Sequence, residues 1–281
     1  SSLASMTTDT SAKVRLELAC VAGQFGDAGA IPGELPPVAR SVLRSGSKTV
    51  DAAEILAELL HSDTDPYLRA AVMSSLNSSN INNTIDKFIT VVQADASANE
   101  PSVSKIASFT AADRDELTSI LFEQAASIAS DDNLERILRL TVDDSHGGLR
   151  AWQMLSLAKM LDRLKARGSK ILAHLADNNQ QTTMTNALKT ARTIAADATK
   201  NEILRVAAIP LLLRSPDQSA DEVLLKDMLT PQTPVSVQEA AIRHLGQQSN
   251  VSSADILLAG WSSHSPAIRA LILSVISSRS E

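Results

Sequence analysis

The chain has 281 residues, of which 44% are hydrophobic and 21% charged, and its formal net charge is −6. This composition excludes a disordered or fibrous chain. Aromatic residues make up 2%, and glycine and proline number 10 each. That argues against a sheet protein, because sheets favour aromatic side chains and need many turn residues. We therefore predict an all-α protein.

Apolar residues recur at helical spacing along almost the whole chain. The polar stretch 94–103 predicts a soft break within what we expect to be a single domain over 1–281. The periodicity predicts about fifteen helices, near 11–24, 35–45, 50–61, 66–77, 81–93, 102–109, 111–129, 132–142, 148–167, 169–177, 180–198, 201–214, 220–229, 234–247, 253–261 and 266–278.

A short pattern recurs at the start of six predicted helices: a polar residue, two further positions, an aliphatic residue, and then Arg or Gln. Clear copies are Asp65-Pro-Tyr-Leu68-Arg69 and Ser265-Pro-Ala-Ile268-Arg269. The last two intervals, 33 and 31 residues, are typical of a helix-hairpin repeat, and the longer ones leave room for extra helices. The Arg or Gln positions are Arg15, Arg69, Arg150, Arg205, Gln238 and Arg269.

The polar residue of the pattern predicts an N-cap, whose side-chain oxygen accepts a hydrogen bond from a first-turn amide. Pro66 and Pro266 then occupy the first helical position, where a missing N–H costs nothing. A cation in the first turn opposes the helix dipole. We therefore expect each Arg to bind a carboxylate or carbonyl of the preceding turn or of a neighbouring repeat. The expected N-caps are Ser11, Asp65, Asn201 and Ser265.

Capped hairpins in which an aliphatic-Arg pair opens the second helix resemble HEAT repeats over most of the chain. The segments 14–25, 65–76 and 256–279 further resemble the helical middle region of large exported proteins of planctomycete-type bacteria. Those proteins, often labelled membrane-bound dehydrogenases or haem-binding proteins, carry a propeller-type, sugar-dehydrogenase-like domain before this region and a c-type haem domain after it.

The resemblance implies a HEAT-like or armadillo-type α-α superhelical solenoid that connects a propeller to a cytochrome. It implies an exported, periplasmic or membrane-associated parent protein, with neighbouring domains of the same polypeptide or a protein partner as the contacts. The haem-attachment signature Cys-x-x-Cys-His does not occur in this chain. No catalytic, cofactor-binding or metal-binding residue of the family is therefore carried over, and the binding surface is not identified.

The histidines and acidic residues are interpreted as structural. No two of the five histidines lie within five residues, so no pair forms a metal-binding face on one helix. The group His61, Asp63 and Asp65 is interpreted as a helix end followed by an N-cap. The sequence Asp143-Asp-Ser-His146 is interpreted as a polar turn, because a catalytic triad needs convergent geometry rather than adjacency.

Three further residues are expected to have structural roles. Trp152 and Trp261 each lie in an apolar helical stripe, and Cys20 lies among aliphatic residues. We expect a core or inter-repeat role for both tryptophans and a buried, inert thiol at Cys20.

Two classes of function remain. The first is a non-catalytic scaffold without a cofactor, which positions neighbouring domains or binds a partner protein. The alternative is an enzyme on HEAT-like repeats that acts on nucleic acid, similar to the bacterial alkylpurine DNA glycosylases. The net charge of −6 and the scarcity of aromatic residues argue against nucleic-acid binding. No run of apolar residues is long enough for a transmembrane helix.

Overall fold

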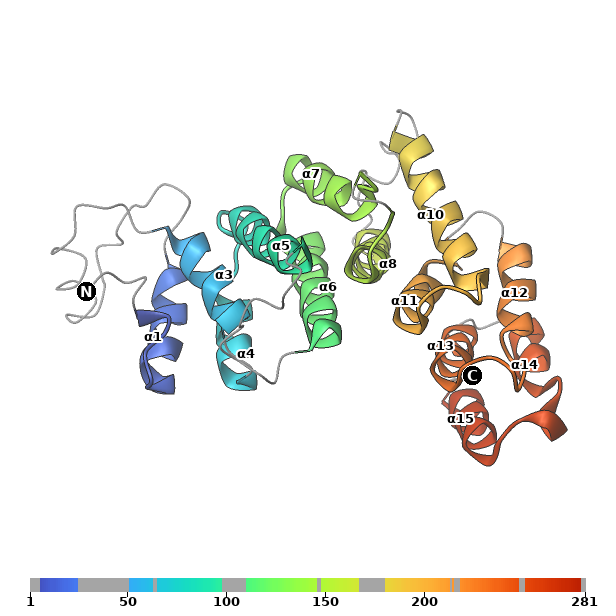
Figure 1. Ribbon diagram of the computed structural model, residues 1–281. Coiled ribbons are helices and arrows are strands. Elements are labelled where there is room, and N and C mark those ends of the chain that lie inside the picture. The colour runs from blue at the N-terminus through green and yellow to red at the C-terminus, as the bar shows by residue number, and fades with distance from the viewer. Residues whose placement is uncertain are drawn as a thin grey trace, which may run out of the picture. The chain divides into compact units, whose positions relative to one another are not determined.

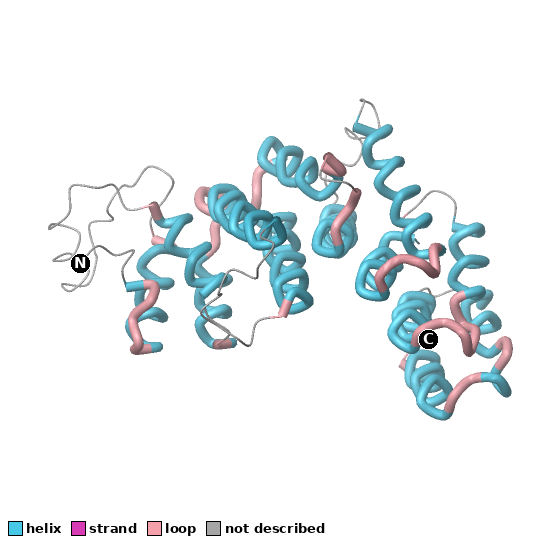
Figure 2. The backbone as a smooth tube through the Cα atoms, viewed as in Figure 1, coloured by secondary structure: helices cyan, strands magenta, loops and turns pink. Residues whose placement is uncertain are grey.

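The computed structural model describes residues 6–24, 51–62, 65–97, 110–145, 148–166, 180–212, 214, 218–247 and 251–278. Within these ranges the chain forms thirteen α-helices and one 3-10 helix, and no strand (Figures 1 and 2). The prediction of an all-α protein is confirmed. The helices expected near 35–45, 102–109 and 169–177 lie outside the described residues.

The chain divides into two compact units, Ser1–Ile137 and Leu138–Glu281. The division lies inside a helix, C-terminal to the polar stretch 94–103. In the first unit α1 packs on α3 and α4, α3 packs on α4 and α5, and α5 packs on α6. The helices up to the division are α1 (Ala12–Ala22), α3 (Ala52–Ser62), α4 (Pro66–Ser75), α5 (Ile81–Ser97), α6 (Ala111–Ile128) and α7 (Asp131–Val142), which spans it.

The second unit contains a row of helices in which α8 packs on α11, α11 on α13 and α13 on α15. Alongside the row, α10 packs on α11, α12 on α13 and α14, and α14 on α13 and α15 (Figure 1). Each helix thus packs mainly on its near neighbours in sequence. The elements are α8 (Ala151–Ala166), α10 (Gln180–Ala196), α11 (Glu202–Leu212), α12 (Gln218–Asp227), α13 (Val235–Gly246), α14 (Val251–Leu258), η2 (Trp261–Ser263) and α15 (Pro266–Ser277).

Three of the four predicted N-caps are confirmed. Asp65 Oδ1 accepts from the amide of Tyr67 at 2.8 Å, and Asn201 Oδ1 accepts from that of Ile203 at 2.8 Å. Ser265 Oγ accepts a hydrogen bond from the backbone amide of Ile268 at 3.3 Å. The prediction for Ser11 is wrong: its side chain makes no capping bond, and its amide instead donates to the Asp9 carboxylate at 2.8 Å.

Two pairs of helices make the same close contact at the same register. Gly23 and Gly246 are each the twelfth residue after the N-cap of α1 and α13. A Cβ atom at Gly23 would lie 2.5 Å from the Cβ of Ser75, and one at Gly246 would clash with Cγ1 of Val275. Ser75 and Val275 are each the tenth residue after the N-cap of α4 and α15. The pairs α1–α4 and α13–α15 therefore pack with their C-terminal ends side by side, in parallel.

Candidate interaction surface

The recurring Arg side chains reach back to carbonyl groups that precede their own helices. Arg205, the fourth residue of α11, is buried, and its Nε donates to the carbonyl of Ala195 in the last turn of α10 at 3.1 Å. Arg269, the fourth residue of α15, donates from Nε to the carbonyl of Trp261 at 2.9 Å and from Nη2 to that of Ser262 at 2.8 Å. These bonds confirm the expectation of a carbonyl partner in the preceding turn.

The first and fifth copies of the pattern behave in the same way. Arg15 Nη1 donates to the carbonyl of Asp9, and Gln238 Nε2 donates to that of Thr233 at 2.7 Å. Carbonyls at a helix C-terminus or in a turn lack intrahelical partners, and a cation is favourable near them. For the arginines, the interaction with the preceding carbonyl therefore offsets the unfavourable position of a cation in the first turn, whereas Gln238 makes the same bond without a charge.

The copy at Arg150 departs from the pattern. Arg150 stands just before α8, and Gln153 takes over the role: its Nε2 donates to the carbonyls of Leu140 at 2.9 Å and Asp143 at 2.7 Å. The Oε1 atom of Gln153 accepts from the Arg150 amide at 2.9 Å. The sequence pattern pointed to the wrong residue here, because α8 begins later than the pattern implies.

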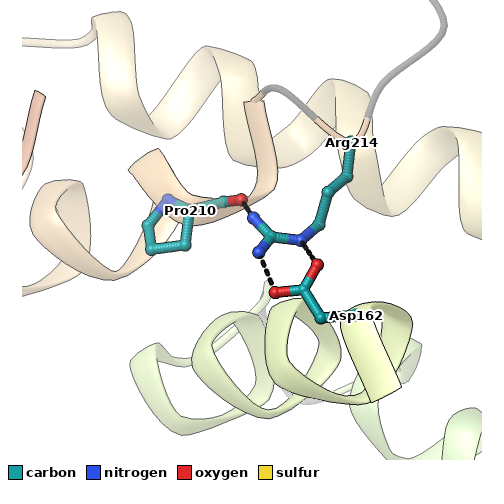
Figure 3. A network of polar contacts seen from close by, with 3 residues as sticks. All are labelled: Asp162, Pro210 and Arg214. Atoms are coloured by element: carbon teal, nitrogen blue, oxygen red, sulfur yellow. Dashed lines mark hydrogen bonds and ion pairs between the residues drawn. The ribbon is translucent and has the colours of Figure 1, made fainter. Parts of the chain in front are cut away.

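Arg214 joins two helices of the row (Figure 3). Its guanidinium lies between the carboxylate of Asp162 on α8 and the carbonyl of Pro210 in α11, with Nε 2.9 Å from Oδ1 of Asp162. Nη2 also bonds to Asp162 Oδ2, and Nη1 bonds to the carbonyl of Pro210. This link satisfies a carbonyl of the proline-containing helix and fixes the end of α11 against α8.

The buried His244 lies close enough to Arg214 and Asp162 for their charges to affect its pKa. Burial of His244 on α13, and secondarily the positive charge of Arg214, lower its pKa to about 4, while Asp162 acts in the opposite direction. His244 is therefore neutral at physiological pH. In the first unit, burial raises the pKa of Asp115 on α6 to about 6. Perturbed groups often mark functional sites, but the main cause of each of these two shifts is burial of a single group.

A second ion pair joins α10 to α12. Arg192 Nε lies 2.6 Å from Oδ1 of Asp221, whose side chain is fully buried. Burial of a carboxylate is costly unless the group is paired. Removal of Arg192 would therefore leave the buried Asp221 carboxylate without its compensating charge. Sequence reasoning missed this pair and the Arg214–Asp162 pair, because nothing in the sequence connects residues 29 and 52 positions apart.

Of the residues singled out for chemistry, those that the structure describes have separate structural roles. His61 lies in the last turn of α3 with its ring edge-on to Phe88, with centroids 6.4 Å apart, while Asp65 caps α4. Asp143 accepts from the amide of Ser145 at 3.0 Å within a turn. Asp63 and His146 lie outside the described residues. Among the residues that the structure describes, no group of three His, Cys, Asp or Glu side chains could hold a metal ion.

The expectation of a buried thiol at Cys20 is wrong. Cys20 is exposed, because the buried face of α1 is formed by Leu18, Ala19 and Ala22 and Cys20 lies off that face. Trp261 is half-buried in the 3-10 helix η2, where the guanidinium of Arg269 lies 5.9 Å from its ring centroid.

The positions of Cys20 and Trp261 both follow from the local backbone. Successive residues of a helix point about 100° apart, so an aliphatic neighbourhood in sequence does not bury Cys20. Gly260, with φ 73°, ends the preceding helix before Trp261 is reached. Trp152, by contrast, is 3% exposed, so its expected core position is confirmed.

The exposed apolar side chains of the second unit include two at the starts of row helices and one on the last helix. Ile203 is 53% exposed, Val235 56% and Leu273 55%. Ser236 Oγ donates to the Glu202 carboxylate, which places the N-termini of α11 and α13 side by side. These helices therefore run parallel.

Charge is distributed unevenly between the units. Residues 1–137 contain 19 acidic and 10 basic side chains, whereas residues 138–281 contain 13 acidic and 16 basic ones.

None of the helices in the described ranges combines the length and the apolar character that crossing a membrane requires. Comparison of the chain with protein-family models, with curated proteins and with solved structures finds no match.

Proposed function

We propose that this chain is a non-catalytic helical-repeat scaffold of the HEAT-like type, which positions neighbouring domains or binds a partner protein. One observation carries the proposal. The contact between the twelfth residue after the N-cap of one helix and the tenth residue after the N-cap of another recurs in α1–α4 and in α13–α15. The same geometry at both ends of the chain is the property expected of a repeat.

The arginine pattern supports the same conclusion. Helices whose pattern residues are 54, 55, 33 and 31 positions apart pack directly on each other: α1 with α4, α8 with α11, α11 with α13, and α13 with α15. The intervening chain varies in length, yet the stacked helices remain neighbours. A stack of this kind buries a continuous core and presents an extended surface suited to binding.

We further propose, from the resemblance to the planctomycete-type exported proteins, that the neighbouring domains are a propeller-type dehydrogenase and a c-type cytochrome. The scaffold would then hold the two redox domains at a defined separation. Its own contribution is mechanical, and the chemistry belongs to the flanking domains.

The nucleic-acid alternative has one observation in its favour, the basic surplus of residues 138–281. Several of these cations are already engaged: Arg205 and Arg269 bind carbonyls, and Arg192 and Arg214 bind carboxylates. Phosphate binding depends on Lys and Arg side chains that are free to neutralise phosphates and so release the counterions of the DNA. Duplex DNA titrated at several salt concentrations between about 50 and 200 mM should therefore show no salt-dependent binding, and a steep dependence would favour this alternative.

The connector proposal is tested on the reading frame that encodes the chain. We expect a propeller-type domain before this region and a Cys-x-x-Cys-His sequence after it. Purified, this chain mixed with haem should give no stoichiometric Soret band. It has one cysteine, whereas covalent attachment needs a pair, and its histidines and methionines show no paired spacing for axial ligation. A flanking sequence without either domain, or a stoichiometric haem spectrum from this chain, would contradict the connector role.

A further inference from the structure

We infer that the outer face of α15, formed by Ala270, Leu273, Ser274 and Ser277, is a docking surface for one more helix. That helix would belong to the neighbouring domain of the same polypeptide and would pack on α15 as α15 packs on α13. The inference rests on the proposed scaffold function and assigns it a surface.

The argument begins with one register position along the row. Ile209, Ile242 and Leu273 are each the eighth residue after the N-cap of α11, α13 and α15. Ile209 and Ile242 are fully buried, whereas Leu273 is 55% exposed. α11 and α13 are each followed in the row by another helix, α13 and α15. On α15 the same apolar position is left open.

The side of α15 that meets α13 is a different one. Val275, the tenth residue after the N-cap, faces Gly246 of α13. In a helix the eighth and twelfth residues share one face and the tenth lies on the opposite side. The α13–α15 interface is therefore heterologous, with the side of α13 that carries its twelfth residue against the tenth-residue side of α15, and the α1–α4 interface has the same arrangement.

The open face has the size and charge that another helix requires. At the twelfth position, where α1 and α13 carry glycine, α15 carries the small Ser277. Ala270, Ser274 and Ser277 are exposed, and none of the four residues of the face is charged. Arg269 is turned away from it toward the carbonyls of Trp261 and Ser262. Small residues allow two helices to approach closely, as Gly246 of α13 does against Val275 of α15.

These features define the occupant. It is a helix that runs parallel to α15 and presents a small or aliphatic residue, such as Ser75 or Val275, at its tenth position. A twofold-related second copy fits less well, because it would bring two eighth-residue sides together, whereas the row joins unlike sides. Continuity with the α13–α15 interface therefore favours a further helix, and the proposed connector role assigns that helix to the same polypeptide.

The test is thiol labelling in a Cys20→Ser background, since Cys20 is exposed and would react. Leu273→Cys is the test variant, and Ser277→Cys repeats the measurement on the same face. Val223→Cys is the control, because Val223 is 60% exposed on α12, away from this face. Each variant is made in this chain and in the full-length protein encoded by its reading frame, and circular dichroism checks the fold.

In this chain, a thiol at position 273 or 277 should react with a maleimide as fast as one at 223. In the full-length protein, labelling at 273 and 277 should be about tenfold slower or more, with labelling at 223 unchanged, because a packed helix must open before its contacts react. Equal reactivity at 273, 277 and 223 in the full-length protein would overturn the docking surface. Concentration-dependent protection in this chain, with association seen by sedimentation, would assign the face to a second copy and overturn it as well.

The two proposals fail in distinguishable ways. A full-length protein that contains neighbouring domains but labels freely at position 273 overturns only the docking surface. A reading frame without any neighbouring domain overturns both the connector role and the docking surface that rests on it.

Discussion

Arg214 and Asp162 lie 52 residues apart, and their side chains join the end of α11 to α8 through two bonds between one guanidinium and one carboxylate. Asp162 is 59% exposed and Arg214 18%, so water screens the attraction in part. A double-mutant cycle with Arg214→Ala and Asp162→Ala should give a coupling free energy of about 1 kcal/mol, which falls in high salt. Arg243→Ala, an exposed change on α13, should be additive with Asp162→Ala; a coupling of zero for Arg214 would reject the link.

Arg205→Ala should lower the free energy of unfolding by roughly 1–3 kcal/mol, because it leaves the Ala195 carbonyl without its charged donor. Urea denaturation midpoints measure the change. Lys226→Ala, on an exposed position of α12, is the control and should stay within about 0.5 kcal/mol. An Arg205 variant as stable as the parent would show that the bond to the carbonyl contributes nothing.

Gly246→Ala should destabilise the chain although alanine favours helices by about 1 kcal/mol over glycine. The added methyl group would overlap Cγ1 of Val275, and overpacking typically costs about 1–3 kcal/mol. Val275→Ala should rescue Gly246→Ala, which thermal unfolding of the single and double variants will show. Gly23→Ala should resist rescue by Ser75→Ala, since its Cβ would also lie 2.7 Å from the carbonyl oxygen of Ser75. Independent, additive effects at 246 and 275 would disprove the contact.

His244 predicts a loss of stability in acid. Its pKa is lowered from 6.5 to about 4 in the folded chain, so the unfolded chain binds more protons between these values. Stability is therefore full above pH 6.5 and falls as the pH drops to about 4. The difference in unfolding free energy between the parent and His244→Leu should shift by about 3 kcal/mol over this range. A pH-independent difference would contradict burial of the neutral imidazole.

Asp115 predicts the opposite trend. Its pKa is raised from 3.8 to about 6, so the folded chain binds the extra proton and gains stability as the pH falls from 6 toward 4. Asp115→Asn should therefore be more stable than the parent at pH 7, and this advantage should shrink on acidification. Chemical denaturation at several pH values measures both trends, and a constant difference would mean that the carboxyl group is well solvated when folded.

Local sequence was sufficient to predict the helices of the described ranges and three of the four expected N-caps. The N-caps at Asp65, Asn201 and Ser265 depend on residues two or three positions away, and the carbonyl partner of Arg205 lies only 10 residues back. Such contacts are written in short stretches of chain, so periodicity and capping rules recover them.

Contacts between distant helices could not be predicted in this way. The Arg192–Asp221 pair depends on how α12 packs, which no local pattern states. One signal was present but unused: Gly23 and Gly246 each follow their pattern residue, Arg15 or Gln238, by eight positions. The shared spacing marks the close approach of stacked helices, and could have identified both contacts from the sequence.

The reach of the pattern residues has a consequence for how such a chain changes over evolutionary time. Arg15, Arg205, Gln238 and Arg269 each bind a carbonyl between 5 and 10 residues back, so donor and acceptor travel together within one segment of chain. A helical hairpin can therefore be duplicated, deleted or lengthened as one unit without separating the donor side chain from its acceptor carbonyl. Lineages that carry this pattern should differ in the number of hairpins far more readily than in the spacing between an arginine and its carbonyl.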